Sequence, residues 1–333
     1  MPAIVAEALA KHFTPEIRAV DGIDLAIDEG QIFGFLGANG SGKTTTVRML
    51  TTLLRPTAGR AEVLGLDVTQ SPGEVRKRIG VALQEAGLDD IQTGRELLTL
   101  QARLYRLPAA NVRERVDYLL RVVDLEDAAD RRVKTYSGGM KRRLDLAAAL
   151  VHRPKVVFLD EPTTGLDPIS RESIWRYVAE LNKAEGVTFF LTTQYLEEAD
   201  RLADDVAIMD AGRIVAQGSP AELKASIGTD VVSLHIEGGA DELARAEQAV
   251  RRFEGVDDVR TVGDAVIVYV REGSSAIARL VLLLDGASLR AREVTLKQPT
   301  LDDVFLQKTG HHLEAEDHAA RTASEQPPRN RRP

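Results

Sequence analysis

Two absences narrow the function classes before any motif is considered. The 333-residue sequence contains no cysteine, which excludes a disulfide scaffold and a thiolate metal site and fits a reducing compartment. It also has no run of the roughly 18 consecutive apolar residues that a membrane-spanning helix needs, and its first residues lack the basic start and apolar stretch of a signal peptide. We therefore expect that any membrane-embedded part of its machinery is a separate subunit.

A basic charge balance is also missing. The net charge is -8 at pH 7, which argues against a protein that coats nucleic acid, and we expect no nucleic-acid partner. Hydrophobic content of 44% and charged content of 28% are ordinary for a globular protein with a real core. The length suggests about two domains, at roughly 150 residues each.

Short apolar runs alternate with longer helical stretches over the first two thirds of the chain. The runs 31–36, 156–159 and 189–192 suit buried parallel strands, and 97–105 and 112–123 are typical of helices. This alternation predicts an α/β domain with a parallel core sheet over residues 1–228.

The rest of the chain has a different pattern. Residues 229–311 predict the order β-α-β-β-α-β of a small ferredoxin-like α+β domain. Residues 312–333 are polar, contain Pro327 and Pro328 and end in a basic cluster, which predicts a disordered tail.

A glycine-rich turn follows the first of the predicted strands and opens a helix. Its sequence, Gly37-Ala38-Asn39-Gly40-Ser41-Gly42-Lys43-Thr44, fits the pattern G-x-x-x-x-G-K-[ST]. Glycines allow several backbone N–H groups to point at one phosphate, and the helix dipole favours the anion. We expect the turn, with Thr45, to bind a nucleotide such as ATP, with Lys43 at the β- and γ-phosphates and Thr44 on Mg²⁺. A coincidental turn is the alternative, and the strand and helix on either side argue against it.

A second run, 156–162, is a hydrophobic strand that ends in two acids. At the carboxyl end of a strand beside the phosphate loop, Asp160 suits Mg²⁺ coordination. Glu161 is the candidate to polarise the attacking water. The alternative is an acidic turn without a function. The segment 162–167, which follows directly, argues against this alternative.

A third segment, Ser137-Gly138-Gly139, begins a strong helical pattern. A hydroxyl, closely spaced N–H groups and a helix dipole make a second anion site. One ATP does not need both anion sites from one chain if they lie on separate faces. The economical solution is a head-to-tail homodimer, in which each copy offers its phosphate loop to one ATP and residues 137–139 to the other.

The order of these motifs resembles the ATP-binding cassette (ABC) ATPases over nearly the whole chain. The resemblance implies that Gln84 contacts Mg²⁺ and a membrane subunit, that Asp167 lies at the dimer interface, and that Phe13 stacks on the purine of ATP or GTP. Gln194 stands at the switch position, where the wider family has histidine, and Met140 replaces the signature glutamine. Glutamine can donate a hydrogen bond to the γ-phosphate but cannot become a cation. Slow hydrolysis is therefore expected, with catalytic roles for Glu161, Gln194 and Lys43.

Three longer runs, 135–145, 191–200 and 301–310, resemble the daunorubicin-resistance DrrA-like branch of drug-export ATPases. That branch implies an ATP-hydrolysing subunit at the cytoplasmic face of a bacterial membrane, paired with a multi-span permease that exports hydrophobic antibiotics or lipids. One alternative is an ABC ATPase of DNA repair or translation. Repair members carry a long coiled coil for which the segment between Lys43 and Ser137 has no room, and translation members typically hold two cassettes. The other alternative is a non-hydrolysing regulatory subunit.

Overall fold

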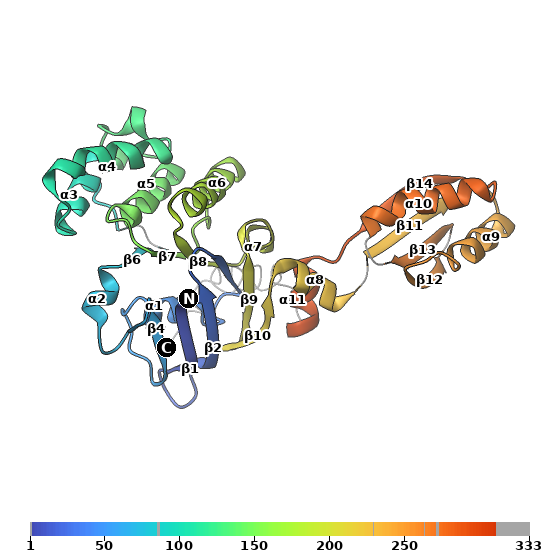
Figure 1. Cartoon of the computed structure of the whole chain (residues 1–333), viewed down its shortest axis with the longest axis horizontal. Helices are drawn as coiled ribbons and strands as arrows, with labels where there is room; N and C mark the ends of the chain where they lie inside the picture. The colour runs from blue at the N-terminus through green and yellow to red at the C-terminus, as the bar shows by residue number, and fades with distance from the viewer. Residues whose placement is uncertain (1, 85–86, 229, 263, 271–272, 311–333) are drawn as a thin grey trace, which may run out of the picture. The chain divides into compact units, whose positions relative to one another are not determined.

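The computed structural model describes residues 2–84, 87–228, 230–262, 264–270 and 273–310 (Figure 1). It divides into two compact units, one up to Pro220 together with the chain from Lys308, and one of residues 221–307. The boundary predicted after residue 228 falls between helix α8 (Pro220–Ile227) and strand β11 (Asp230–Ile236). The predicted tail, 312–333, lies outside the described residues.

A six-stranded sheet of order β10-β9-β3-β8-β7-β6 is the centre of the first unit. The strands are β3 (Ile32–Leu36), β6 (Ile79–Ala82), β7 (Val156–Asp160), β8 (Thr188–Thr193), β9 (Asp205–Asp210) and β10 (Arg213–Gly218). The edge strand β10 runs antiparallel to β9, and all other neighbours pair in parallel. The predicted parallel core sheet is confirmed.

The same unit contains a four-stranded antiparallel sheet of order β2-β1-β4-β5, which was not predicted from the sequence. Its strands are β1 (Pro2–His12), β2 (Arg18–Asp28), β4 (Ala58–Val63) and β5 (Leu66–Asp67). Strand β2 alternates between buried and exposed residues along its second half, as a half-buried strand does.

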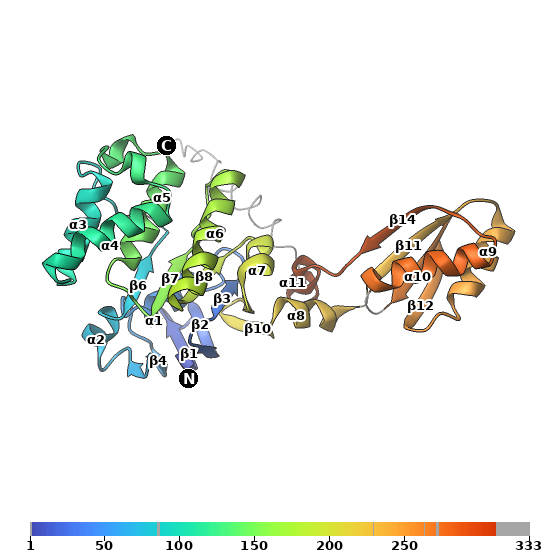
Figure 2. The ribbon, with the colours of Figure 1, turned by 45° about the horizontal axis from the view of Figure 1, so that its top comes forward.

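Two hydrophobic cores lie on the two faces of the six-stranded sheet, because successive side chains of a strand point to opposite faces. Phe33, Phe158 and Phe190 pack with α1 (Lys43–Leu50) and the antiparallel sheet. Ile32, Val157 and their neighbours on the other face pack with four helices. These are α3 (Gly94–Leu104), α4 (Ala109–Val122), α5 (Gly138–Leu150) and α6 (Pro168–Glu185). Figure 2 shows α3, α4 and α5 gathered into a helical subdomain.

Shorter elements complete this unit: α2 (Pro72–Arg76), α7 (Leu196–Leu202) and the 3₁₀ turns η1 (Glu126–Ala128) and η2 (Val133–Thr135). No helix in the described part of the chain is both long enough and apolar enough to cross a membrane.

The second unit confirms the predicted ferredoxin-like order. Strand β11 is followed by α9 (Ala240–Val250), β12 (Val256–Val262), β13 (Ala265–Val270), α10 (Gly273–Gly286) and β14 (Ala291–Lys297). The sheet order is β12-β13-β11-β14, and every pair is antiparallel. Helices α9 and α10 share a hydrophobic core with the strands. Leu301, Val304 and Phe305 of helix α11 (Leu301–Thr309) are buried.

Candidate active site

The glycine-rich turn connects β3 to α1 and has little room for side chains. Gly42 has a φ of 113°, and a Cβ there would lie 2.2 Å from the carbonyl oxygen of Ala19. A Cβ on Gly37 would lie 2.3 Å from the carbonyl oxygen of Met209. No side chain caps the start of α1, so no side chain competes with an anion for the first N–H groups of the helix.

Two polar side chains are buried in this turn. The Lys43 ammonium donates to the carbonyl oxygens of Gly37 (2.7 Å) and Ala38 (2.9 Å) and lies 3.9 Å from a carboxylate oxygen of Glu161. The hydroxyl oxygen of Ser41 is buried without a hydrogen-bond partner among the described residues. A buried polar group without a partner costs about 1–3 kcal/mol. The turn therefore has the chemistry of a site that a polar ligand completes.

The other predicted nucleotide-binding residues lie around the turn. Asn39 and Gly40 are exposed at its tip, and Thr44 and Thr45 are half-buried in the first turn of α1. Phe13 lies between β1 and β2 and is 56% exposed, with the Lys11 ammonium 5.4 Å from its ring centroid. An exposed aromatic ring offers apolar surface that a purine base could cover.

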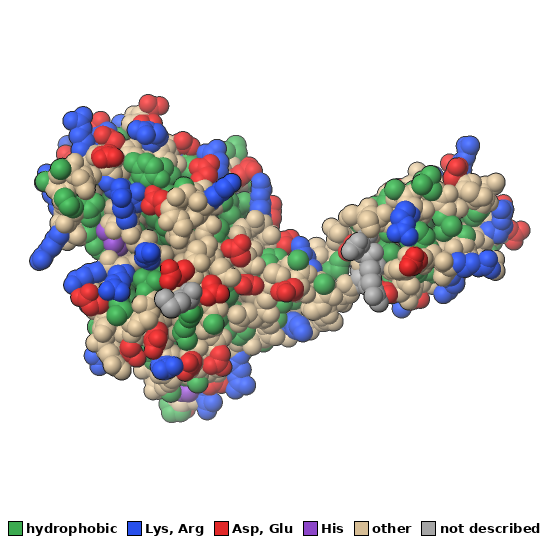
Figure 3. All heavy atoms as spheres, in the orientation of Figure 1, with side chains coloured by type: hydrophobic (Ala, Val, Ile, Leu, Met, Phe, Trp, Pro, Cys, Tyr) green, Lys and Arg blue, Asp and Glu red, His purple; other side chains and the backbone are tan. Residues whose placement is uncertain are grey.

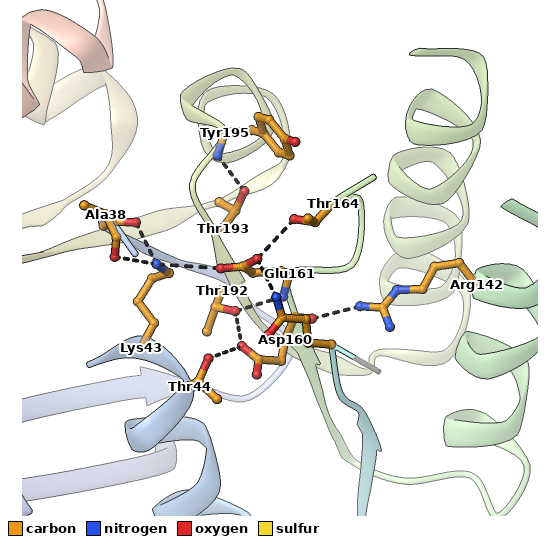
Figure 4. A network of polar contacts seen from close by, with 12 residues as sticks. Ala38, Lys43, Thr44, Arg142, Asp160, Glu161, Thr164, Thr192, Thr193 and Tyr195 are labelled. Carbon is orange, nitrogen blue, oxygen red and sulfur yellow. Dashed lines mark hydrogen bonds and ion pairs between the residues drawn. The ribbon is translucent and has the colours of Figure 1, made fainter. Parts of the chain in front are cut away.

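Asp160 ends β7 beside the phosphate loop (Figure 4). One of its carboxylate oxygens accepts hydrogen bonds from the hydroxyls of Thr44 (3.2 Å) and Thr192 (2.6 Å). The residue is 1% exposed, so two hydroxyls from α1 and β8 fix a buried carboxylate. Hydroxyl and carboxylate oxygens are hard ligands that suit Mg²⁺ together with substrate phosphates, and this pair fits the predicted magnesium site.

Glu161 adopts a left-handed backbone, with a φ of 48°, which costs a residue with a side chain about 1–2 kcal/mol. Its N–H donates to the hydroxyl (2.9 Å) and to the carbonyl oxygen (3.1 Å) of Thr192. Its carboxylate accepts from the Thr164 hydroxyl at 3.2 Å, and the Gln84 amide lies 3.5 Å away. Strain that the surroundings hold in place is common at active sites. The fold thus brings Lys43, Gln84 and Glu161 together.

Arg142 of α5 also reaches these segments, although no role was predicted for it from the sequence. Its guanidinium donates to the carbonyl oxygens of Leu83 (2.6 Å), Asp160 (2.8 Å) and Pro162 (2.8 Å), and to the carboxylate of Asp145 at 3.2 Å. Burial lowers the pKa of Arg142 and raises the pKa of Asp145 to about 6, against the attraction of Arg142. Only its position in the sequence, just after the Ser-Gly-Gly segment, could have drawn attention to it.

The other predicted residues lie at or near the ends of elements. The Ser137 hydroxyl accepts from the N–H of Met140 at 3.2 Å and caps α5; Ser137 and Gly138 are exposed, and Gly139 is buried. Asp167 caps α6, where hydrogen bonds from Ser170 lower its pKa. Gln194 is half-buried directly after β8.

Comparison with known proteins identifies the family. The ABC transporter family matches residues 20–164, and the family described as the ATP-binding protein DrrA1-3-like, C-terminal domain, matches residues 218–309. The daunorubicin resistance ATP-binding protein DrrA2 of Streptomyces coeruleorubidus is 46% identical over 313 residues, which are 94% of this chain and 96% of the relative. The chain belongs to the DrrA-like ABC ATPases.

Solved ABC ATPases have the same fold as about two thirds of this DrrA-like ATPase. The cbiO1 protein of Clostridium perfringens, part of the ABC transporter complex cbiONQ, is 30% identical and has a TM-score of 0.63 over 67% of this chain and 91% of that chain. A dimeric structure of a bacterial ABC transporter cassette is 25% identical, with a TM-score of 0.60 over 65% of this chain and 98% of that chain.

These matches confirm three predictions for the DrrA-like ATPase: the family resemblance, the fold class, and the function of an ATP-binding, ATP-hydrolysing subunit of an ABC exporter. The first family match contains the phosphate loop, Gln84, residues 137–139 and both acids at the end of β7, and the second spans the ferredoxin-like unit. The assignment of single residues to steps of the reaction is a proposal, as follows.

Proposed function

We propose that this ATPase acts as a homodimer that binds two MgATP and drives a separate multi-span permease from the cytoplasmic face of a bacterial membrane. The observation that carries the proposal is the convergence of Lys43, Asp160 and Glu161 beside the uncapped start of α1. A positive charge, a magnesium ligand and a candidate base there meet the needs of phosphoryl transfer, which are positioning and charge stabilisation.

Within one copy, each residue has a distinct role. Lys43 and the N–H groups of residues 37–45 bind the phosphates of ATP, and Phe13 covers the purine. Thr44, Asp160 and Gln84 would hold Mg²⁺, which supplies positive charge at the phosphate oxygens when bound. Glu161 orients the attacking water, and Gln194 donates a hydrogen bond to the γ-phosphate without adding charge. The buried Ser41 hydroxyl, which has no partner among the described residues, supports a polar ligand in this place.

The second copy completes the site. Ser137 and Gly138 are exposed at the start of α5, where they are accessible to the γ-phosphate of an ATP held by the other copy, and Gly139 follows them. Asp167, exposed at the start of α6, lies at the same interface in this proposal. The dimeric structure of a cassette 25% identical to this chain supports the arrangement. ATP then joins the two copies, and its cleavage lets them separate.

The cargo that we propose is a hydrophobic drug or a lipid, since the Streptomyces relative is described as a daunorubicin resistance protein. The proposed division of labour places nucleotide binding and docking to the permease in residues 1–228, with residues 229–311 as an accessory domain.

A groove of about 420 Å³ beside Gln84 is the place where we propose that the permease docks. It is lined from α2, β6, α3 and α5, and Figure 3 shows the surface hollowed between the parts that carry α2 and α3. Leu53 and Tyr105 of its lining are 56% and 40% exposed. Leu83, directly before Gln84, is also part of the lining, so that an occupant of the groove would touch the segment that enters the active site.

The test is co-purification of the Glu161→Gln variant from detergent-solubilised native membranes with MgATP present. The expected partner is a protein with several membrane spans, captured with ATP and lost without it. Leu53→Glu should abolish the capture, because it replaces an exposed apolar side chain of the groove with a charge. Leu282→Glu, at a leucine of α10 that is more exposed (70%), should leave the capture unchanged. Capture of ribosomal or DNA-bound proteins in place of a permease contradicts the proposal. Loss of permease capture with Leu282→Glu but not with Leu53→Glu would place the docking surface on the second unit.

A further inference from the structure

Arg142 is a buried cation that the proposed reaction does not use. It lies in the second turn of α5, is 8% exposed, and donates four hydrogen bonds, three of them to backbone carbonyls outside its own helix. A buried guanidinium is stable only if its N–H groups are satisfied and its charge is paired. Asp145, one turn further along α5, supplies the charge.

Two of the three carbonyls belong to Asp160 and Pro162, the residues on either side of Glu161. Figure 4 shows the contact with Asp160. Glu161 itself has the left-handed backbone, and its N–H is held from the opposite side by Thr192. One planar group from α5 therefore fixes the backbone before and after the proposed catalytic carboxylate. Without it, the contacts of Thr192 and Thr164 would be left to oppose relaxation of the strained residue.

The third carbonyl belongs to Leu83, which directly precedes Gln84. Gln84 lies 3.5 Å from the Glu161 carboxylate, so the guanidinium also sets the distance between two segments whose side chains meet at the site. Its acceptors lie in different directions. Nε donates to the carbonyl oxygen of Pro162, Nη2 to that of Asp160 and Nη1 to that of Leu83. The rigid fork of arginine can reach all three, whereas the single ammonium of lysine cannot.

We propose that Arg142 is a positioning residue for ATP hydrolysis, whose guanidinium fixes the backbone of Glu161 and the segment before Gln84 in its own chain, with Asp145 as its counter-ion. This inference rests on the proposed role of Glu161. Arg142 does not touch the substrate in this proposal; it acts through Glu161. It should therefore govern the rate of cleavage and leave the affinity for ATP nearly unchanged.

The first test compares Arg142→Lys with a matched control in the next residue. Arg143 also donates to two backbone carbonyls, those of Val123 and Asp124 at 3.1 Å each, but none of its hydrogen bonds within the described residues reaches the segments of the active site. Arg142→Lys should lower kcat about 10- to 100-fold, the effect of a misplacement of about 1 Å at a reacting group. The KM for ATP should change less than about twofold, and Arg143→Lys should keep the wild-type kcat.

Equal kcat values for the two lysine variants overturn the proposal, because a positive charge without the planar guanidinium would then suffice at position 142. So does a parallel loss of ATP affinity and thermal stability that accounts for the whole drop in rate. If Arg142→Lys yields too little folded protein, the double variant Arg142→Gln/Asp145→Asn removes both charges of the buried pair at once. The same fall in kcat with unchanged KM is expected there, and a wild-type kcat overturns the proposal.

Mixed dimers show whether Arg142 acts on Glu161 of its own chain or on the ATP site of the other copy. In one dimer, one copy carries Glu161→Gln and the other carries Arg142→Lys; in the second dimer, one copy carries both changes and the other is wild type. Each dimer retains a single active Glu161. Action within one chain predicts that the first dimer hydrolyses ATP at least about tenfold more slowly than the second.

The reverse order would show that Arg142 acts through residues 137–139 on the ATP of the other copy, and it overturns the proposal. Wild-type turnover of the Glu161→Gln homodimer is a separate result, since it contradicts the proposed role of Glu161 itself.

Discussion

Thr192→Val tests how the two acids of the active site are held. The Thr192 hydroxyl donates to Asp160 at 2.6 Å and accepts from the N–H of Glu161 at 2.9 Å, in a position that is completely buried. Valine has nearly the same shape, so the change removes the two hydrogen bonds without leaving a cavity. The Glu161 N–H keeps the carbonyl oxygen of Thr192, and Asp160 keeps the Thr44 hydroxyl.

The expected magnitude follows from what is lost. A hydrogen bond to a charged group contributes about 1.5–3 kcal/mol, and each 1.36 kcal/mol of lost transition-state stabilisation lowers a rate about tenfold. If the hydrogen bond from the Thr192 hydroxyl to the Asp160 carboxylate orients Asp160 and Glu161, kcat should fall about 10-fold or more. Thermal stability should also fall, by about 1–3 kcal/mol in the free energy of unfolding.

The matched control is Thr188→Val in the same strand. Thr188 is 1% exposed, and its hydroxyl accepts from the N–H of Gly30 at 2.9 Å, at the opposite end of β8 from Thr192. Urea unfolding should show similar losses of stability for the two variants, and steady-state hydrolysis should show a loss of kcat for Thr192→Val alone. If both variants hydrolyse ATP at the same rate, the hydroxyl serves only the stability of the strand, and the reasoning is refuted.

Three further outcomes are expected. Gln194→His should raise kcat about fivefold, because a protonatable ring adds about 1 kcal/mol of charge assistance at the switch position; steady-state hydrolysis measures it. Ser41→Ala should not lower the melting temperature without ligand, since the buried hydroxyl has no partner among the described residues, but should reduce the shift that MgATP produces. Asp145→Asn should flatten the pH dependence of stability. Burial raises the pKa of Asp145 from 3.8 to about 6, so the wild type loses about 3 kcal/mol as the pH rises through that window, which urea unfolding at about pH 4 and 7 detects.

The phosphate loop, the acid pair and the Ser-Gly-Gly segment could be predicted from the sequence because each is a contiguous motif whose chemistry is local. The ferredoxin-like unit could also be predicted, since its strands and helices follow one another with clear changes of period. The antiparallel sheet was missed for an identifiable reason. Strand β1 has irregular register with both neighbours, including a shift between Ala6 and Leu9, and this breaks the alternation on which a strand prediction depends.

The parts of the site that escaped prediction depend on contacts between distant segments. Thr192 meets Asp160 across two neighbouring strands, and Arg142 meets Leu83 and Pro162 only after α5 has packed against the sheet. Neither residue type indicates such a role by itself, because threonine is common in strands and an arginine in a helix is usually exposed. The contacts of Thr192 and Arg142 could be identified only from the folded structure.

The most direct measurement is the mass of the Glu161→Gln variant by light scattering, with and without MgATP. A shared ATP between two copies predicts twice the 36.3 kDa of one chain with MgATP, one chain without it, and one chain again when Ser137→Glu places a negative charge at the start of α5. A mass of one chain at a concentration of MgATP that demonstrably fills the phosphate loop would contradict the shared site.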